Sequence, residues 1–383
     1  MATDIRRKNW RSTFNLFGEA KVNDYTYKIN EKSNKSEWIY NSLHLGVYCG
    51  EKHGIIYADM MGGYASDRDN FLYVINKDAD GNPDYENGQA QIHWDDRFRP
   101  EILSQIADTQ FITVGLEKKT DGKTFYNKFL SPYDAIAYVG EHLTDGMVVR
   151  VRGTLQYSIY QGNTQVRKNI NSIVLSTVTA EGYNASFKQS VLIDGDSANL
   201  KDIDIDKGTM PVSVRVLDYL KELNGEEIRG QYPFYIDMEY AFPDATNKKQ
   251  CETIYNSLFK VKKDVTQINF DGEFVESGAV VLPKLEDLDE DILACIEMGL
   301  YTEEEALQKC ATNGAREKRM ILLKPDFVKT DDETVLAVYP ERYSEEDLDV
   351  GGAEPEEEVD MSEVNSVDVG DADEDMEWLK ALG

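Results

Sequence analysis

Residues 146–176 constrain the fold more than any other stretch, because they read as two β-strands joined by a tight turn. In the first strand, most odd positions from Met147 to Ile159 are apolar and most even positions are polar, as in a strand with one buried face. With Gly162 and Asn163 as a two-residue hairpin loop, apolar side chains meet across the strands. The expected pairs are Ile159 with Val166, Leu155 with Ile170, Ser158 with Arg167, Gln156 with Asn169 and Tyr157 with Lys168. The last pair puts a cation on the face that is otherwise expected to be buried.

The other face of this hairpin carries cationic and hydrogen-bonding side chains. They are Arg150, Arg152, Arg167, Asn169 and Tyr160. The chain has a formal net charge of −30, yet residues 1–180 hold 22 acids and 21 bases and are nearly neutral. Residues 181–340 hold 32 acids and 18 bases, and residues 341–383 hold 17 acids and two bases. A polyanionic ligand is therefore expected to bind the first part of the chain, since the remainder repels it.

The elements expected before the hairpin have an informative order. Alternating apolar residues predict strands over 38–49, 55–61, 70–76, 111–117 and 123–130. Ser131 and Pro132 then provide an N-cap and a first-turn proline for a helix that ends at Gly146. Strands, one helix and a closing hairpin are the layout of the OB-fold, a five-stranded Greek-key barrel that binds oligonucleotides. We therefore expect an OB-fold domain over residues 37–180. Residues 1–36 are expected to form an N-terminal arm that either packs loosely or contacts nucleic acid.

The same order recurs over residues 181–340, after an acidic linker around 194–207. The expected elements are strands at 210–217 and 232–241, a helix at 248–259, a hairpin at 265–281, a helical insertion at 285–319 and a closing strand at 320–328. The chain is thus predicted to be mainly β with some α, and to contain a second OB-like domain. This domain has no comparable arginine face, and its expected role is structural support or self-association.

Residues 341–383 lose the apolar periodicity and are expected to form a disordered acidic tail. The tip of this tail nevertheless brings back Trp378, Leu379 and Leu382. A tail that served only solubility would not need an aromatic residue and two leucines. We interpret the tip as a docking motif for a partner protein, and the alternative is a terminal helix that packs on its own chain.

No motif of enzyme chemistry is present in the sequence. It lacks a GxxxxGK[ST] phosphate loop, a GxSxG elbow and an HExxH motif, and its four cysteines and four histidines are scattered. The loop that starts at Asp78 is similar to a calcium loop, but Pro83 replaces its glycine and Gln89 its bidentate glutamate. We therefore predict a non-enzymatic protein without metal or cofactor. No apolar run is long enough for a membrane span and no signal peptide is present, so we expect a soluble, cytoplasmic protein.

Binding a single strand of nucleic acid requires cations that contact phosphates and aromatic faces on which bases stack. Tyrosines at outward strand positions are the candidates for stacking, although a tyrosine on a strand is more often ordinary packing. The predicted DNA-binding residues are Arg150, Arg152, Tyr160, Arg167, Lys168, Tyr57, Tyr126 and Lys128.

The hairpin motif VRVRG, its Gly-Asn turn and the acidic tail with a hydrophobic tip resemble single-stranded DNA-binding proteins of tailed phages. The resemblance implies sequence-independent, cooperative coating of exposed strands in replication, recombination or repair, in the cytoplasm of a host cell. It assigns DNA contact to the hairpin arginines with Tyr160 and Lys168, and recruitment of replication or recombination proteins to the tail tip. The chain departs from the family in its length, its acidic second domain and its Lys-Ala-Leu-Gly end.

Two other classes of protein remain open from the sequence. An acidic structural or assembly protein of a virus would use the OB-like domains to bind protein. A nuclease would hold magnesium with an acidic pair such as Asp95 with Asp96, or Asp67 with Asp69, although a chain with 71 acids contains such pairs by chance. The fluorescence of tyrosine and tryptophan on addition of oligo-dT, with and without magnesium, separates the three classes.

Overall fold

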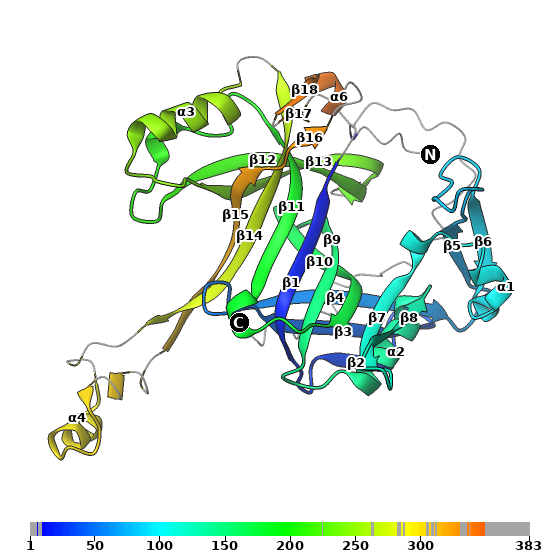
Figure 1. Cartoon of the computed structure of the whole chain (residues 1–383), viewed down its shortest axis with the longest axis horizontal. Coiled ribbons are helices and arrows are strands. Elements are labelled where there is room, and N and C mark those ends of the chain that lie inside the picture. The colour runs from blue at the N-terminus through cyan, green and yellow to red at the C-terminus, as the bar shows by residue number, and fades with distance from the viewer. Residues whose placement is uncertain are drawn as a thin grey trace.

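The computed structural model describes residue 6 and residues 10–348, apart from 224, 262–263, 282–284, 286–287, 304–305, 308–309, 311, 330–334 and 337. Within these residues, a 14-stranded sheet curls into two β-barrels. Figure 1 shows the barrels in contact, with the long strands of both running through the middle of the molecule.

Five strands close the first barrel. They are β1 (Ser12–Lys21), β3 (Trp38–Tyr48), β4 (Ile55–Ala65), β9 (Val148–Tyr160) and β10 (Asn163–Leu175). The order around the barrel is β1-β3-β4-β10-β9, and β9 pairs back to β1. Neighbours are antiparallel except β4 and β10, which are parallel. Because α2 (Pro132–His142) lies between β4 and β9 in sequence, the strand order and the helix position are those of an OB-fold, and the predicted fold class is confirmed.

The first strand corrects the expected arm over residues 1–36. In β1, the side chains of Phe14, Leu16 and Ala20 are buried in the barrel core. β1 pairs with β9 and β3 inside the first barrel and with β11 on its other side. A barrel strand needs only one apolar face, so a segment rich in polar residues still fits. The barrel therefore begins at β1 and not at residue 37.

Shorter elements surround the first barrel. β7 (Ile112–Lys118) and β8 (Thr124–Phe129) form the expected hairpin, and β7 extends the sheet beside β10. Ser131 caps α2 as predicted, since its hydroxyl accepts a hydrogen bond from the backbone N–H of Tyr133. The other elements are β2 (Tyr27–Lys32), β5 (Phe71–Ile75), β6 (Gln89–His93), α1 (Pro100–Leu103) and 3-10 helices at Trp94–Asp96, Asp108–Gln110 and Ala180–Gly182.

The second barrel repeats the strand order of the first. Its strands are β11 (Asn184–Ile193), β12 (Thr209–Leu223), β13 (Glu226–Ala241), β14 (Val265–Val281) and β15 (Thr312–Pro325). The order is β11-β12-β13-β15-β14, β14 pairs back to β11, and the parallel neighbours are β13 and β15. α3 (Lys248–Leu258) lies between β13 and β14 in sequence, as α2 does between β4 and β9. This is the second OB-like unit that the sequence predicts.

Three details of the second half differ from the prediction. β15 begins at Thr312, inside the helical insertion expected over 285–319, and not at residue 320. β14 is one long strand and not a hairpin, because it pairs with β11 and β15 and not with itself. Residues 341–348 belong to the fold, since Tyr343 in β18 (Val338–Tyr343) and Leu348 in α6 (Glu345–Leu348) are buried. The tail tip with Trp378, Leu379 and Leu382 lies outside the described residues.

Small elements complete this half of the chain. They are a 3-10 helix at Leu200–Asp202, α4 (Glu290–Glu297), β16 (Val328–Lys329) and β17 (Val335–Leu336). In the part of the chain that the structure describes, no helix has both the length and the apolar character that crossing a membrane requires.

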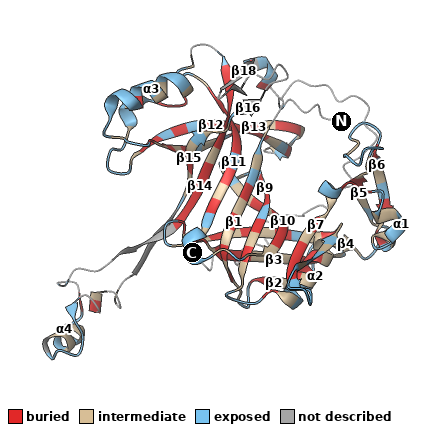
Figure 2. Ribbon diagram, viewed as in Figure 1, coloured by how far each residue is buried: buried red, intermediate tan, exposed pale blue. Residues whose placement is uncertain are grey.

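The two barrels share one sheet and one core. β1 pairs along β11, so the sheet continues from the first barrel into the second. Buried residues of both barrels form one cluster, and Figure 2 shows them alternating with more exposed residues along the central strands. Tyr157 of β9 packs on Phe234 of β13, with ring centroids 6.1 Å apart, and the ring of His53 donates a hydrogen bond to the carbonyl of Phe274. These contacts hold the barrels in one relative position.

Candidate nucleic-acid interface

The β9–β10 hairpin has a two-residue loop, but the loop is Gln161-Gly162 and not Gly162-Asn163. Both loop residues have positive φ, 49° at Gln161 and 79° at Gly162, as a type I′ turn requires. Asn163 consequently pairs with Tyr160, and the pairs up to Ile170 are shifted by two residues from the expected register. A shift of two leaves each side chain on its predicted face, because strand side chains alternate with period two.

Three arginines lie on the outward face of this hairpin. Arg152 is exposed, whereas Arg150 and Arg167 are half-buried. Among the described residues, none of the three makes an ion pair, in contrast to Lys168 and Arg215, whose partners are carboxylates. Cations gathered on one face without carboxylate partners favour an anionic ligand.

Arg150 is held in place by β1. Its Nε donates a hydrogen bond to Asn15 Oδ1 at 2.7 Å, and its guanidinium carbon lies 5.0 Å from the centroid of the Phe17 ring. Burial, followed by the charge of Arg152, lowers the pKa of Arg150, although a guanidinium stays protonated at neutral pH. Asn15 and Phe17 are not among the predicted residues, because their segment was expected to form an arm.

Strand register brings Lys128 onto the surface of the hairpin. Arg152 lies opposite Ser172 of β10, Ser172 opposite Thr113 of β7, and Thr113 opposite Lys128 of β8. Residues directly opposite one another in a sheet point to the same face. Lys128 is therefore in one row with Arg152 and three strands away, a span of about 14 Å.

Tyr126 lies in the neighbouring row of the same surface. Its ring covers Gly115 of β7, where an added Cβ would come within 2.9 Å of Tyr126 Cδ1. Gly115 lies opposite Val174 of β10, and Val174 lies opposite Arg150. The tyrosine is 57% exposed, so its ring is accessible to a ligand beside the arginines.

The two predicted lysines have different surroundings. Lys128 Nζ lies 3.1 Å from Asp108 Oδ1, and both side chains are exposed, so this ion pair contributes less than about 1 kcal/mol and is easily exchanged. Lys168 is buried: its Nζ lies 2.7 Å from Glu276 Oε1, with side chains 10% and 6% exposed, and 4.7 Å from the Phe274 ring centroid. The prediction that Lys168 contacts DNA is therefore corrected, because its ammonium group is buried and already forms an ion pair with Glu276 of the second barrel.

Tyr57 belongs to a polar group on β3 and β4. Its ring stacks on His44 at a centroid distance of 4.7 Å, and His44 Nδ1 lies 2.6 Å from Asp59 Oδ1. Asp59 lies opposite Asn169 of β10, so the group adjoins the hairpin. His44 is not among the predicted residues, although its position opposite Asp59 in the paired strands 38–49 and 55–61 was a usable signal.

Tyr160 marks the tip of the hairpin, where it is half-buried next to the loop. We name the surface described here the outer face. It comprises Tyr57, Tyr126, Lys128, Arg150, Arg152, Tyr160 and Arg167, with His44, Asn15, Phe17 and Asn169 between or beside them. Seven of the eight residues predicted to contact DNA thus belong to this curved surface, and Lys168 does not.

The loop that is similar to a calcium site forms a turn between β5 and β6. Asp78 Oδ1 accepts hydrogen bonds from the backbone N–H groups of Asp80 and Asn82, at 2.9 and 2.8 Å. Over the described ranges, no group of three or more His, Cys, Asp and Glu side chains is arranged to hold a metal ion.

Residues 109–267 match the family described as YorF, a range that includes the β9–β10 hairpin and strands of both barrels. No curated protein matches the chain. The wild-type single-stranded DNA binding protein from Thermus aquaticus is a similar solved structure, at 11% identity and a TM-score of 0.30, covering 70% of this chain and 85% of that chain. A deletion mutant of the same protein gives 12% identity and a TM-score of 0.28, with coverage of 70% and 87%.

Proposed function

We propose that this protein binds single-stranded DNA on the outer face, without sequence preference. The observation that carries the proposal is the set of Arg150, Arg152 and Arg167, which have no ion-pair partner among the described residues. These arginines lie in the nearly neutral part of a strongly acidic chain. A phosphate backbone would relieve the repulsion between them and release counterions from the strand.

The tyrosines favour a single strand over a duplex. Tyr57, Tyr126 and Tyr160 present rings near the arginines, and stacking of a base on an aromatic ring contributes about 1–3 kcal/mol whatever the base. A duplex keeps the faces of its bases inside its own stack, so these rings would have no partner there. The proposed ligand is therefore an unpaired strand.

We further propose that the protein acts by binding alone, in the cytoplasm, during replication, recombination or repair. The absence of enzyme motifs from the sequence supports this proposal. Trp378, Leu379 and Leu382 at the end of the acidic tail are proposed to recruit a replication or recombination protein, and self-association of the chain is proposed to support coating of longer strands.

Intrinsic fluorescence tests the function directly. Oligo-dT added at low salt is expected to quench the tyrosine and tryptophan emission, with no loss of oligonucleotide when magnesium is present. A hairpin duplex of equal charge is the control and is expected to bind more weakly. Absence of quenching would favour the assembly scaffold, cleavage with magnesium would favour the nuclease, and equal binding of oligo-rU would extend the ligand to RNA.

A further inference from the structure

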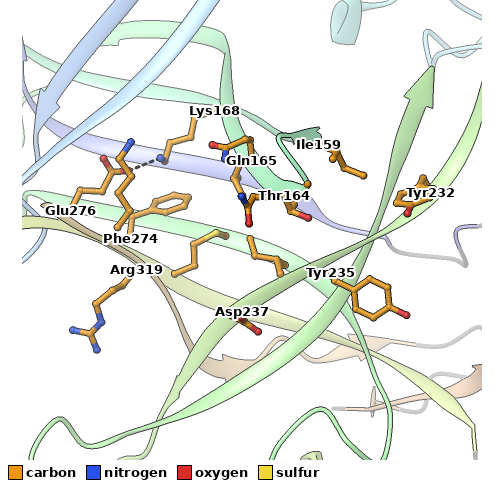
Figure 3. A pocket seen from close by; sticks show the side chains of 16 residues that line it. Ile159, Thr164, Gln165, Lys168, Tyr232, Tyr235, Asp237, Phe274, Glu276 and Arg319 are labelled. Carbon is orange, nitrogen blue, oxygen red and sulfur yellow. Dashed lines mark hydrogen bonds and ion pairs between the residues drawn. The ribbon is translucent and has the colours of Figure 1, made fainter. Parts of the chain in front are cut away.

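The groove between the hairpin tip and the second barrel does not extend the outer face. It has a volume of about 590 Å³, and the cations in its lining are Lys168, Lys318 and Arg319. Lys168 is paired with Glu276, as Figure 3 shows, and Arg319 is paired with Glu239. Two of these three cations thus already have carboxylate partners, so the groove offers a phosphate backbone little charge to bind. A strand longer than one outer face therefore needs another surface.

The outer face ends at the open edge of β8. Among the described strands, β8 pairs with β7 alone, so it is the last strand of the 14-stranded sheet on this side. Outside that ladder, no described group forms a hydrogen bond with the backbone of residues 124–129. In an antiparallel ladder, the backbone groups of every second residue point away from the partner strand. Those of β8 are therefore available to another strand.

The other described edges of the sheet are less suitable for pairing. β2 is interrupted by a bulge between Lys28 and Glu31, where Asn30 has a positive φ of 56°, and bulges protect an edge from pairing. β18 lies in the acidic part of the chain, where two copies would repel each other. β8 is regular, since the bulge in its ladder adds a residue to β7, and it belongs to the nearly neutral residues 1–180.

The two faces of β8 differ in chemistry. Tyr126 and Lys128 belong to the outer face, and Tyr126 is 57% exposed. Phe125 and Phe129 alternate with them and point to the other side of the strand. This side faces α2, because the ring centroids of Phe129 and Tyr138 lie 5.5 Å apart. Phe125 is 40% exposed, so an aromatic ring on this side remains in contact with solvent.

A second β8 strand is complementary to this edge. In an antiparallel pair with the two Asn127 residues opposite each other, Tyr126 of each copy lies opposite Lys128 of the other. On the other side of the sheet, Phe125 of each copy lies opposite Phe129 of the other. A cation beside an aromatic ring and two adjacent aromatic rings are both favourable pairs. Because residues directly opposite one another share a face, the outer faces of the two copies become one surface.

We propose that two copies of this protein associate by pairing their β8 strands. The inference rests on the proposed function and deepens it, because it names the surface for the self-association proposed there. A longer DNA strand would pass from one outer face to the other across Tyr126 and Lys128 of both copies. A contact with two-fold symmetry closes on itself, so the expected assembly is a dimer and not a fibre.

A cysteine at the two-fold axis tests the pairing without DNA. Asn127→Cys is expected to form an interchain disulfide on mild oxidation, visible as a dimer on a non-reducing gel, because the two residues lie opposite each other. Thr120→Cys is the matched control, since Thr120 is exposed in the turn before β8 and lies away from the axis. It is expected to give no more dimer than the wild type, whose Cys295 and Cys310 are partly exposed. Equal amounts of dimer from the two variants would overturn the pairing.

Sedimentation velocity provides a second measurement. Phe125→Lys is expected to weaken the dimer about 2- to 30-fold, which corresponds to the loss of two symmetric cross-strand pairs. Phe71→Lys on β5 is the matched control, because Phe71 is also 40% exposed, and it is expected to leave the dimer unchanged. A wild type that stays monomeric at every concentration, or an equal loss in the control, would overturn the inference.

The same samples separate this inference from the proposed function. A wild type that dimerises through Asn127→Cys pairing but does not quench with oligo-dT would leave the dimer standing and refute DNA binding. A wild type that binds oligo-dT but neither sediments as a dimer nor crosslinks at residue 127 would keep the proposed function and refute the β8 contact.

Discussion

Replacing Arg150 and Arg152 by glutamine is expected to flatten the salt dependence of DNA binding. Each phosphate contact with a single strand contributes about −0.7 to the slope of log K against log salt concentration. Three arginines of the outer face make no ion pair among the described residues, so they contribute about −2.1 in the wild type and about −0.7 in the Arg150→Gln/Arg152→Gln variant. Over a tenfold rise in salt, these contacts lower the affinity about 130-fold in the wild type and about 5-fold in the variant.

The assay is a series of anisotropy titrations with labelled oligo-dT between about 50 and 500 mM salt. The two binding curves are expected to differ most at low salt and to converge as salt rises. The matched control is Lys201→Gln/Lys248→Gln, which removes two exposed charges from the second barrel. It lowers the overall charge of the protein by the same amount but is expected to keep the wild-type slope.

Two results would refute this reasoning. If the arginine variant keeps the wild-type slope, Arg150 and Arg152 are not phosphate contacts. If the lysine control flattens the slope equally, the effect comes from the overall charge of the protein and not from the outer face. Because Arg150 is half-buried and bonded to Asn15, the thermal midpoint of each variant must be measured beside its affinity.

Two further predictions concern the buried ion pair and the tail. Lys168→Met leaves the Glu276 carboxylate buried without its partner and is expected to lower the free energy of unfolding by about 3–5 kcal/mol in urea titrations. Lys32→Met, which breaks a pair to Glu37 whose side chains are 56% and 51% exposed, is expected to cost less than about 1 kcal/mol, and equal losses would contradict the burial of the first pair. Deleting residues 349–383, which hold 13 acids and one base, is expected to raise the affinity for oligo-dT at low salt. The gain should fade as the Debye length falls from about 10 Å at 0.1 M to about 3 Å at 1 M salt, and an unchanged or lower affinity at low salt would exclude competition between tail and DNA.

Local patterns in the sequence were sufficient to place the outward side chains of the hairpin. The face of a strand residue depends on whether its position is odd or even, so Arg150, Arg152 and Tyr160 were assigned correctly without knowledge of the strand partners. The cap of α2 at Ser131 was equally local. The position of the hairpin loop could not be predicted in this way, because a shift of two residues keeps each side chain on its face. Only the positive φ of Gln161 selects the observed register.

Contacts between segments far apart in the chain could not be predicted from the sequence. The partner of Lys168 is Glu276, 108 residues away, and the pattern around Lys168 contains no sign of that carboxylate. The row that joins Arg152 to Lys128 depends on the registers of three strand pairs. β1 has apolar residues at the alternate positions Phe14, Leu16 and Ala20, but its place between β9 and β11 depends on strands far away in the sequence.

The sequence by itself determined the chemistry of this protein: a cationic, tyrosine-bearing strand face in the neutral part of an acidic chain, on a barrel of predicted type. The tertiary structure decided how far that face extends and removed Lys168 from it. The physical reason is that periodicity reports on a strand and its own two faces. Which strands become neighbours is decided by the burial of apolar surface over the whole molecule.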